Sequence, residues 1–259
     1  MKVNVTFLGT GTSQGVPVIG CQCDTCASED KRDTRLRCSV HVQVDDTSIV
    51  IDTGPDFRYQ MLRANVTSLD VVLITHEHND HIIGIDDIRS FNFLQRKDMP
   101  LFATNKVINE LKQRFNYVFG DSQYPGIPRV VTHTITPNKA FEINGVRIQP
   151  IQVMHGKLPV QGFRIGDFTY VTDANFVDEA ARELIRGSQV FVINALRFKE
   201  HHSHFNVDQA VALAKELGVR QTYITHISHH MGKIEDWQSK LPEGVFSAVD
   251  GLSLAIESA

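Results

Sequence analysis

The chain has 259 residues, 42% of which are hydrophobic, and a formal net charge of −4 at pH 7. A chain of this length and hydrophobic content can bury a sizeable core as one domain, and no segment resembles a linker or a repeat. The net negative charge excludes a global basic field for binding nucleic acid.

A glycine-rich turn follows the first apolar stretch, in the sequence Phe7-Leu8-Gly9-Thr10-Gly11-Thr12-Ser13-Gln14-Gly15-Val16-Pro17. Backbone amides freed by Gly9, Gly11 and Gly15 could approach an anionic substrate. A turn that needs positive φ, with no ligand contact, explains the glycines equally well. The segment is not a P-loop, because no Gly-Lys-Ser/Thr sequence follows it.

Cys21, Cys23 and Cys26 form a C-x-C-x-x-C pattern in a polar loop. Such close thiols with little apolar company favour a closed structural zinc site, which needs four ligands. Cys38 lies in the strand-like stretch 38–42, where a small buried thiol is the better interpretation. No apolar signal segment precedes Lys2, so we expect a cytoplasmic protein whose thiols stay reduced.

The densest set of metal-ligand residues follows the apolar stretch 71–74, in the sequence Thr75-His76-Glu77-His78-Asn79-Asp80-His81. The apolar stretch predicts a short buried strand, and His76 and His78 beyond its end can point the same way. Neutral imidazole suits zinc- or manganese-class ions, and the carboxylate of Asp80 adds charge. These candidate ligands exceed what one catalytic metal usually takes from so short a segment. The motif therefore predicts half of a two-metal hydrolytic site.

More ligand-type residues stand directly after strand-like stretches further along the chain. His155 follows the stretch 148–154, Asp173 follows 168–172, and His226 follows 222–225. One histidine after a strand is more often structural, but three repeats of the same arrangement strengthen the metal interpretation.

A histidine-rich loop, His201-His202-Ser203-His204-Phe205-Asn206, precedes a helix that we predict over 207–217. Apolar residues recur there at intervals of three and four, so one face packs inward. Asn206 can cap the start of this helix, and Gly218 ends it. The histidines are thus placed on a loop from which a side chain can reach over a metal centre.

These ligand residues occur in an order that resembles the signature of the metallo-β-lactamase superfamily, and the resemblance covers nearly the whole chain. It implies that one metal binds His76, His78 and His155, that a second binds Asp80, His81 and His226, and that Asp173 bridges them. It also implies that Asp52, after the strand-like stretch 48–51, accepts the distal N–H of a ligand histidine. A plain turn-forming aspartate is the alternative for Asp52.

The expected fold is α/β, because strand-like runs alternate with helical stretches at 107–115, 178–185 and 207–217. Hairpin signals appear at Asn144-Gly145 and Gly166-Asp167. This mixture favours two mixed sheets packed face to face with helices outside, which is the four-layer αββα sandwich that the resemblance implies. We expect a single domain over residues 1–259.

The glycine-rich opening and the cysteine loop resemble the PhnP-type phosphodiesterases. This resemblance implies a structural zinc loop over about residues 20–38, with His229 as the fourth ligand beside Cys21, Cys23 and Cys26. It also implies that His204 acts as general acid or stabilises the substrate phosphate, with His201 as the rival. His204 and Asp80 are the predicted catalytic residues.

The predicted function is therefore a metal-dependent phosphodiesterase that hydrolyses a small anionic phosphodiester, which the resemblance suggests is cyclic. The expected attack is by a hydroxide bridging two divalent ions, manganese or zinc, about 3.5–4 Å apart.

Cleft-lining arginines could include Arg164 and Arg197. Alternatives are a transfer-RNA 3′-processing nuclease, a thioester or lactone hydrolase of the same fold, and a non-catalytic binding protein. We expect no membrane partner, and a homodimer is the default assumption.

Overall fold

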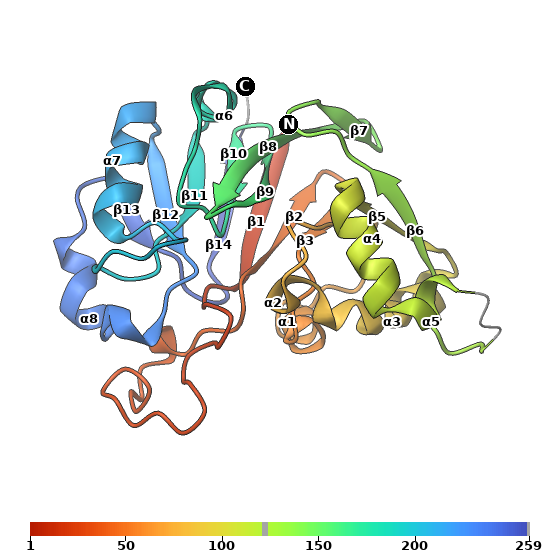
Figure 1. Cartoon of the computed structure of the whole chain (residues 1–259), viewed down its shortest axis with the longest axis horizontal. Coiled ribbons are helices and arrows are strands. Elements are labelled where there is room, and N and C mark those ends of the chain that lie inside the picture. Colours follow the sequence, from red (N-terminus) through yellow and green to blue (C-terminus); the bar gives the residue numbers. More distant parts are fainter. Residues whose placement is uncertain (121–123, 258–259) are drawn as a thin grey trace.

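The strands form two sheets, which Figure 1 shows with helices on their outer sides. The computed structural model describes residues 1–120 and 124–257. In this part of the chain each sheet has seven strands. The first sheet contains, in spatial order, β14 (Ser253–Glu257), β1 (Lys2–Gly9), β2 (Ser39–Val44), β3 (Thr47–Ile51), β4 (Val71–Leu73), β5 (Met99–Ala103) and β6 (Val130–Thr134). The second contains β13 (Val245–Ser247), β12 (Gln221–Thr225), β11 (Val190–Asn194), β10 (Phe168–Val171), β9 (Leu158–Ile165), β8 (Val146–His155) and β7 (Phe141–Ile143).

The helices divide between the two sheets. Those that accompany the first sheet are α1 (Phe57–Arg63), α2 (Asn79–Ile82), α3 (Arg89–Gln95), α4 (Asn105–Arg114) and α5 (Asn116–Phe119). Those that accompany the second are α6 (Glu179–Ile185), α7 (Val207–Leu217) and α8 (Ile234–Trp237). Short 3₁₀ turns complete the chain at η1 (Lys31–Asp33), η2 (Ile83–Ile88), η3 (His229–Met231) and η4 (Gln238–Lys240).

Both sheets are mixed, as predicted. The strands β14, β1, β2 and β3 pair antiparallel, and the ladder continues parallel from β3 to β6. In the second sheet the antiparallel part runs from β7 to β10, and the parallel part runs from β10 to β13. The hairpins predicted at 144–145 and 166–167 join β7 to β8 and β9 to β10.

Three hydrophobic clusters separate the four layers. Successive side chains of a strand point to opposite faces, so a strand buried on both faces contributes to two clusters. Ile49 and Ile51 of β3 pack between the sheets, whereas Val50 packs against the helices of the first sheet. In β11, Val192 packs between the sheets and Phe191 packs toward α6 and α7. The αββα sandwich predicted from the sequence is confirmed.

The predicted cap of the long helix α7 is also confirmed. The Asn206 side chain accepts a hydrogen bond from the backbone N–H of Gln209, whose side chain accepts in turn from the Asn206 backbone N–H. Gly218 ends the helix in the left-handed region, at φ 64°. These two hydrogen bonds fix the first turn of α7, and they therefore also fix the end of the histidine loop that directly precedes it.

The glycine-rich turn leads from β1 into a long connection, which lies at the lower left of Figure 1. A Cβ on Gly9 would clash with the carbonyl oxygen of Arg37, and one on Gly11 would lie 2.9 Å from Arg35 atoms. Close packing against residues 35–37 therefore accounts for these two glycines, and positive φ accounts for Gly15. This packing needs no ligand.

Among the helices of the described residues, none combines the length and the apolar character needed to cross a membrane.

Candidate metal centre

The histidine motif begins directly after β4 and continues into α2. His76 and His81 are fully buried, while His78 is exposed. The Nε2 atom of His76 lies 3.1 Å from Nδ1 of His78. In the first turn of α2, Nε2 of His81 lies 3.2 Å from a carboxylate oxygen of Asp80. The motif thus presents two neighbouring pairs of potential ligands.

Asp173 joins these two pairs. Its Oδ2 atom lies 3.7 Å from Nε2 of His76 and 3.4 Å from Nε2 of His81. Its Oδ1 atom lies 2.9 Å from Nδ1 of His226, which follows β12. The potential ligand atoms form one group of Asp80, His81, Asp173 and His226, a second of His76, His78 and Asp173, and a third of His155, Asp173 and His204. Asp173 belongs to every one of these groups, which is the arrangement expected of a bridging ligand.

His155 is the last residue of β8 and is half-buried. Its ring centroid lies 5.3 Å from that of His78 and 6.0 Å from that of His76. Its Nδ1 lies 2.7 Å from the carbonyl oxygen of Ser203, so Nδ1–H donates and Nε2 stays available to a metal. Sequence reasoning did not identify this carbonyl, because a backbone acceptor leaves no signal in the residue types.

Three of the site residues have left-handed backbone conformations. The φ angles are 68° for Asp52, 58° for Asp173 and 55° for His226, each at the end of a strand. Non-glycine residues rarely adopt positive φ, although Asp and His do so more often than most. Such strain persists where the surroundings fix it and is concentrated at functional sites. Here it turns each side chain out of its strand toward the common centre.

Burial and opposite charges set the protonation of the metal-free site. Burial alone would lower the pKa of His81, but Asp173, Asp80 and Asp52 raise it well above its usual value. Burial likewise disfavours the charged form of His226, but the Asp173 carboxylate beside it raises the pKa of His226 to about 10. Burial and the neighbouring His81 lower the pKa of His76. Without a metal, the chain therefore balances its buried carboxylates with cations at His81 and His226, within the first of these groups, while His76 in the second group is neutral.

The donor atoms also fit a metal. Within the described part of the chain, Nε2 of His81 and Nδ1 of His226 are buried and lie 3.2 Å and 2.9 Å from carboxylate oxygens, yet neither forms a hydrogen bond of normal geometry. Such orphaned polar atoms are rare in folded proteins and need an explanation. Imidazole nitrogens and carboxylate oxygens around one centre are the ligands that zinc- and manganese-class ions accept.

His204 lies against the ligands without belonging to the motif. Its ring stacks 4.8 Å from that of His226 and lies 4.5 Å from that of His155. It is 9% exposed, and its Nδ1 has no hydrogen-bond partner among residues 1–120 and 124–257. His201 lies further out, with Nδ1 3.4 Å from the backbone nitrogen of Ser203, and His202 is exposed. Of the three loop histidines, His204 is the one placed against both ligand rings.

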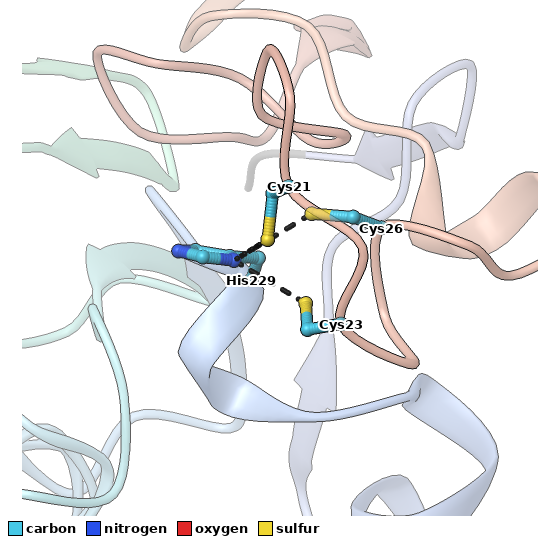
Figure 2. A group of neighbouring side chains, drawn as sticks. All are labelled: Cys21, Cys23, Cys26 and His229. Atoms are coloured by element: carbon cyan, nitrogen blue, oxygen red, sulfur yellow. Dashed lines mark hydrogen bonds between the residues drawn. The ribbon is translucent and has the colours of Figure 1, made fainter.

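The second cluster joins the N-terminal cysteine loop to η3. Figure 2 shows three thiols directed at one imidazole nitrogen. Nδ1 of His229 lies 3.4 Å from Sγ of Cys21, 3.4 Å from Sγ of Cys23 and 3.5 Å from Sγ of Cys26. In a tetrahedron with zinc bond lengths of about 2.3 Å to sulfur and 2.0–2.1 Å to nitrogen, the N···S edge is about 3.5 Å. The cluster therefore fits a zinc ion.

Cys38 lies apart from this cluster, as the sequence suggested. It is 1% exposed, and its thiol lies 3.5 Å from Oγ1 of Thr225. In the loop, hydrogen bonds from the Cys26 backbone and from His229 lower the pKa of Cys23 to about 6, which favours the thiolate that metals bind.

Residues 47–227 match the family model described as the Beta-lactamase superfamily domain. The chain belongs to this superfamily. A crystal structure described as a new diphosphatase from the PhnP family superposes with a TM-score of 0.92 and 39% sequence identity. The alignment covers 99% of this chain and 98% of that one, so this superfamily member is of the PhnP type. Both resemblances predicted from the sequence are confirmed.

Two curated relatives of this PhnP-type chain carry other names. It is 36% identical to an octanoyltransferase of Porphyromonas gingivalis, over 97% of this chain and 51% of that protein. It is 26% identical to a ribonuclease Z of Prochlorococcus marinus, over 64% of this chain and 50% of that protein. The chain thus spans about half the length of these relatives. Human tRNase Z, short form, superposes with a TM-score of 0.68 at 17% identity, which shows a common fold alone.

Proposed function

We propose that this chain is a metal-dependent phosphodiesterase that hydrolyses a small, cyclic phosphodiester. The observation that carries the proposal is the position of Asp173, which lies within reach of both ligand groups while His204 stacks beside them. The PhnP-family relative supports a phosphorus substrate, since it is described as a diphosphatase.

In this proposal the centre would hold two divalent ions. His76, His78 and His155 would hold one ion, Asp80, His81 and His226 would hold the other, and Asp173 would serve both. Bound there, manganese or zinc would activate a water and neutralise the phosphoryl oxygens. The left-handed turns at Asp173 and His226 hold these ligands in place before any metal binds.

His204 is the residue that would contact the substrate. Burial lowers the pKa of His204 to about 2, so the imidazole of the free protein is neutral at physiological pH. A neutral imidazole donates a hydrogen bond from N–H but is a poor proton donor. We therefore favour stabilisation of the phosphoryl oxygens over general acid catalysis for His204. Asp80 acts in this scheme as a charged ligand.

A nuclease is the second candidate, because several relatives are named ribonuclease Z. The net charge of −4 argues against a large polyanion, which would need a broad basic surface. The small substrate thus remains the better proposal.

A substrate panel tests the proposal. Manganese-reconstituted protein is assayed on a cyclic ribose phosphodiester, a linear aryl phosphodiester, a diphosphate diester, a precursor transfer RNA and a thioester. We expect turnover of the small phosphorus esters, fastest on the cyclic one. Cleavage of the precursor RNA alone would favour the nuclease, and cleavage of the thioester alone would refute a phosphodiesterase.

For the second cluster we propose a structural zinc held by Cys21, Cys23, Cys26 and His229. It would tie the N-terminal loop to the segment that carries His226. Two backbone hydrogen bonds already join these parts, from Ile227 N to Thr10 O at 2.9 Å and from Thr12 N to Ile227 O at 3.3 Å.

Replacing Cys26 with serine is expected to release about one zinc per chain and to lower the thermal unfolding midpoint, because structural zinc contributes directly to folding free energy. Elemental analysis after dialysis and calorimetry measure the two effects. Cys38→Ala is the matched control, because Cys38 is the cysteine outside the cluster, and it should keep its zinc. Retention of all zinc by Cys26→Ser would contradict the assignment.

A further inference from the structure

We infer that Thr75 is a positioning residue that extends the reach of one buried carboxylate, that of Asp52, so that Asp52 orients a ligand histidine in each of the two metal groups. Asp52 contacts one of these histidines directly and the other through the Thr75 hydroxyl. The inference rests on the metal sites of the proposed function, but it does not depend on the substrate.

The carboxylate of Asp52 has three donors within hydrogen-bond distance. The backbone N–H of Thr75 donates to Oδ1 at 2.8 Å, and the Thr75 hydroxyl donates to Oδ2 at 2.9 Å. Nδ1 of His81 lies 2.7 Å from the same Oδ2 atom. Asp52 is 0% exposed and Thr75 1%, so these contacts have no competition from solvent. Asp52 was expected to accept the distal N–H of a ligand histidine, and the contact with Nδ1 of His81 has the distance that this hydrogen bond requires.

The Thr75 hydroxyl also reaches the other metal group. Its oxygen lies 2.9 Å from Nδ1 of His76. Because its one proton goes to Asp52, the hydroxyl can only accept from His76, so Nδ1 of His76 must carry a proton. The Nε2 atom of His76 is then left as the metal-binding nitrogen, and it is the atom that faces His78 and Asp173.

We call the chain of contacts from the Asp52 carboxylate through the Thr75 hydroxyl to Nδ1 of His76 the Thr75 relay. Backbone hydrogen bonds fix its members in place. Asp52 donates its backbone N–H to Leu73 at 2.9 Å, and the hydroxyl of Ser39 donates to the Asp52 carbonyl at 2.9 Å. The carbonyl of Thr75 accepts from the backbone N–H of Gln161 at 3.0 Å, which connects β9 of the second sheet to the end of β4. Thr75 is therefore fixed by both sheets, and its hydroxyl has little freedom to turn away from His76.

The sequence around Thr75 did not reveal this role. A threonine after a strand is typical of a simple turn or of a buried β-branched packing position. Only the position of Asp52, which comes 23 residues earlier in the chain, gives the hydroxyl its acceptor. Outer contacts of this type commonly change metal affinity by about 10–100-fold when removed.

Thr75→Val tests the inference, because valine keeps the shape and removes the hydroxyl. We expect the affinity for the first metal group to fall about 10–100-fold, with a smaller change at the second, since His81 keeps its own bond to Asp52. Competition with a chromophoric chelator measures both affinities. Nitrogen-15 spectra of the histidines should show His76 as the Nδ1–H tautomer in the parent and as a mixture in the variant.

Three further variants complete the experiment. Thr75→Ser restores the hydroxyl and should recover most of the affinity, while Thr75→Ala lacks it and should reproduce the loss. Thr169→Val is the matched control, because Thr169 is equally buried and its hydroxyl bonds Ser188 at 2.7 Å, outside the site. Unchanged metal affinities and an unchanged His76 tautomer in Thr75→Val would overturn the inference. A chain that is inactive on every phosphodiester but shows these affinity changes would refute the proposed substrate and leave the relay intact.

Discussion

Replacing His204 with alanine is expected to lower the turnover number on a phosphodiester by about 10²–10³-fold, the usual loss when one donor to the developing charge is removed. His204 stacks against His226 and His155 and is not one of the residues proposed to hold the metals. Because the proposal gives His204 contact with the substrate and not with a metal, both catalytic metals should stay bound. Steady-state kinetics and elemental analysis of the same sample measure the two effects.

His202→Ala provides the control for this variant, because His202 lies on the same loop and is exposed. Its turnover should match the parent. Two results would contradict the assignment of His204. Unchanged turnover would show that His204 takes no part in the reaction. Loss of a metal would show that His204 is a ligand, which is geometrically feasible because its ring lies close to potential ligand atoms of His155 and Asp173.

Asp173→Asn should have the largest effect of any single substitution in the site. The amide cannot supply the bridging negative charge, so we expect both catalytic metals to bind weakly and turnover to fall below detection. The metal-free protein should also be destabilised by about 3–5 kcal/mol, because His226 and His81 would lose the buried carboxylate that balances their charge. Metal titration and urea unfolding measure these effects.

Asp46→Asn is a suitable control for this substitution, since Asp46 is an exposed residue between β2 and β3. It should bind metals and unfold as the parent does. If Asp173→Asn kept two tightly bound catalytic metals, Asp173 would not bridge them, and the proposed centre would be wrong.

The sequence was sufficient to predict the sandwich and the positions of the candidate ligands. The strand-like runs before His155, Asp173 and His226 are strands, and hydrophobic alternation across their two faces produces the layers. The cysteine spacing predicted a zinc loop, and the resemblance to the PhnP type implied His229 as the distant fourth member of the cluster that the structure brings together. Strands and cysteine spacing depend on local pattern, which a sequence records directly, whereas the partner of the cysteine loop came from the resemblance.

Features that depend on distant contacts could not be predicted. The left-handed turns at Asp52 and Asp173 and the Thr75 relay depend on which groups meet after folding. Arg164 illustrates the same limit. The sequence suggested that it could line the cleft, but its guanidinium donates to the backbone carbonyls of Leu184 and Arg186. The glycines Gly9 and Gly11 are needed for close approach to residues 35–37, which no turn rule indicates.

The central claim is that this chain hydrolyses phosphodiesters with two metals shared through Asp173. The most direct test is the turnover of a linear aryl phosphodiester by chelator-treated protein that retains its structural zinc, measured as manganese is added stepwise. The account predicts no turnover at the start and a rise that levels off at about two added equivalents per chain. Turnover without added metal, or two tightly bound ions with no hydrolysis of any phosphodiester, would contradict it.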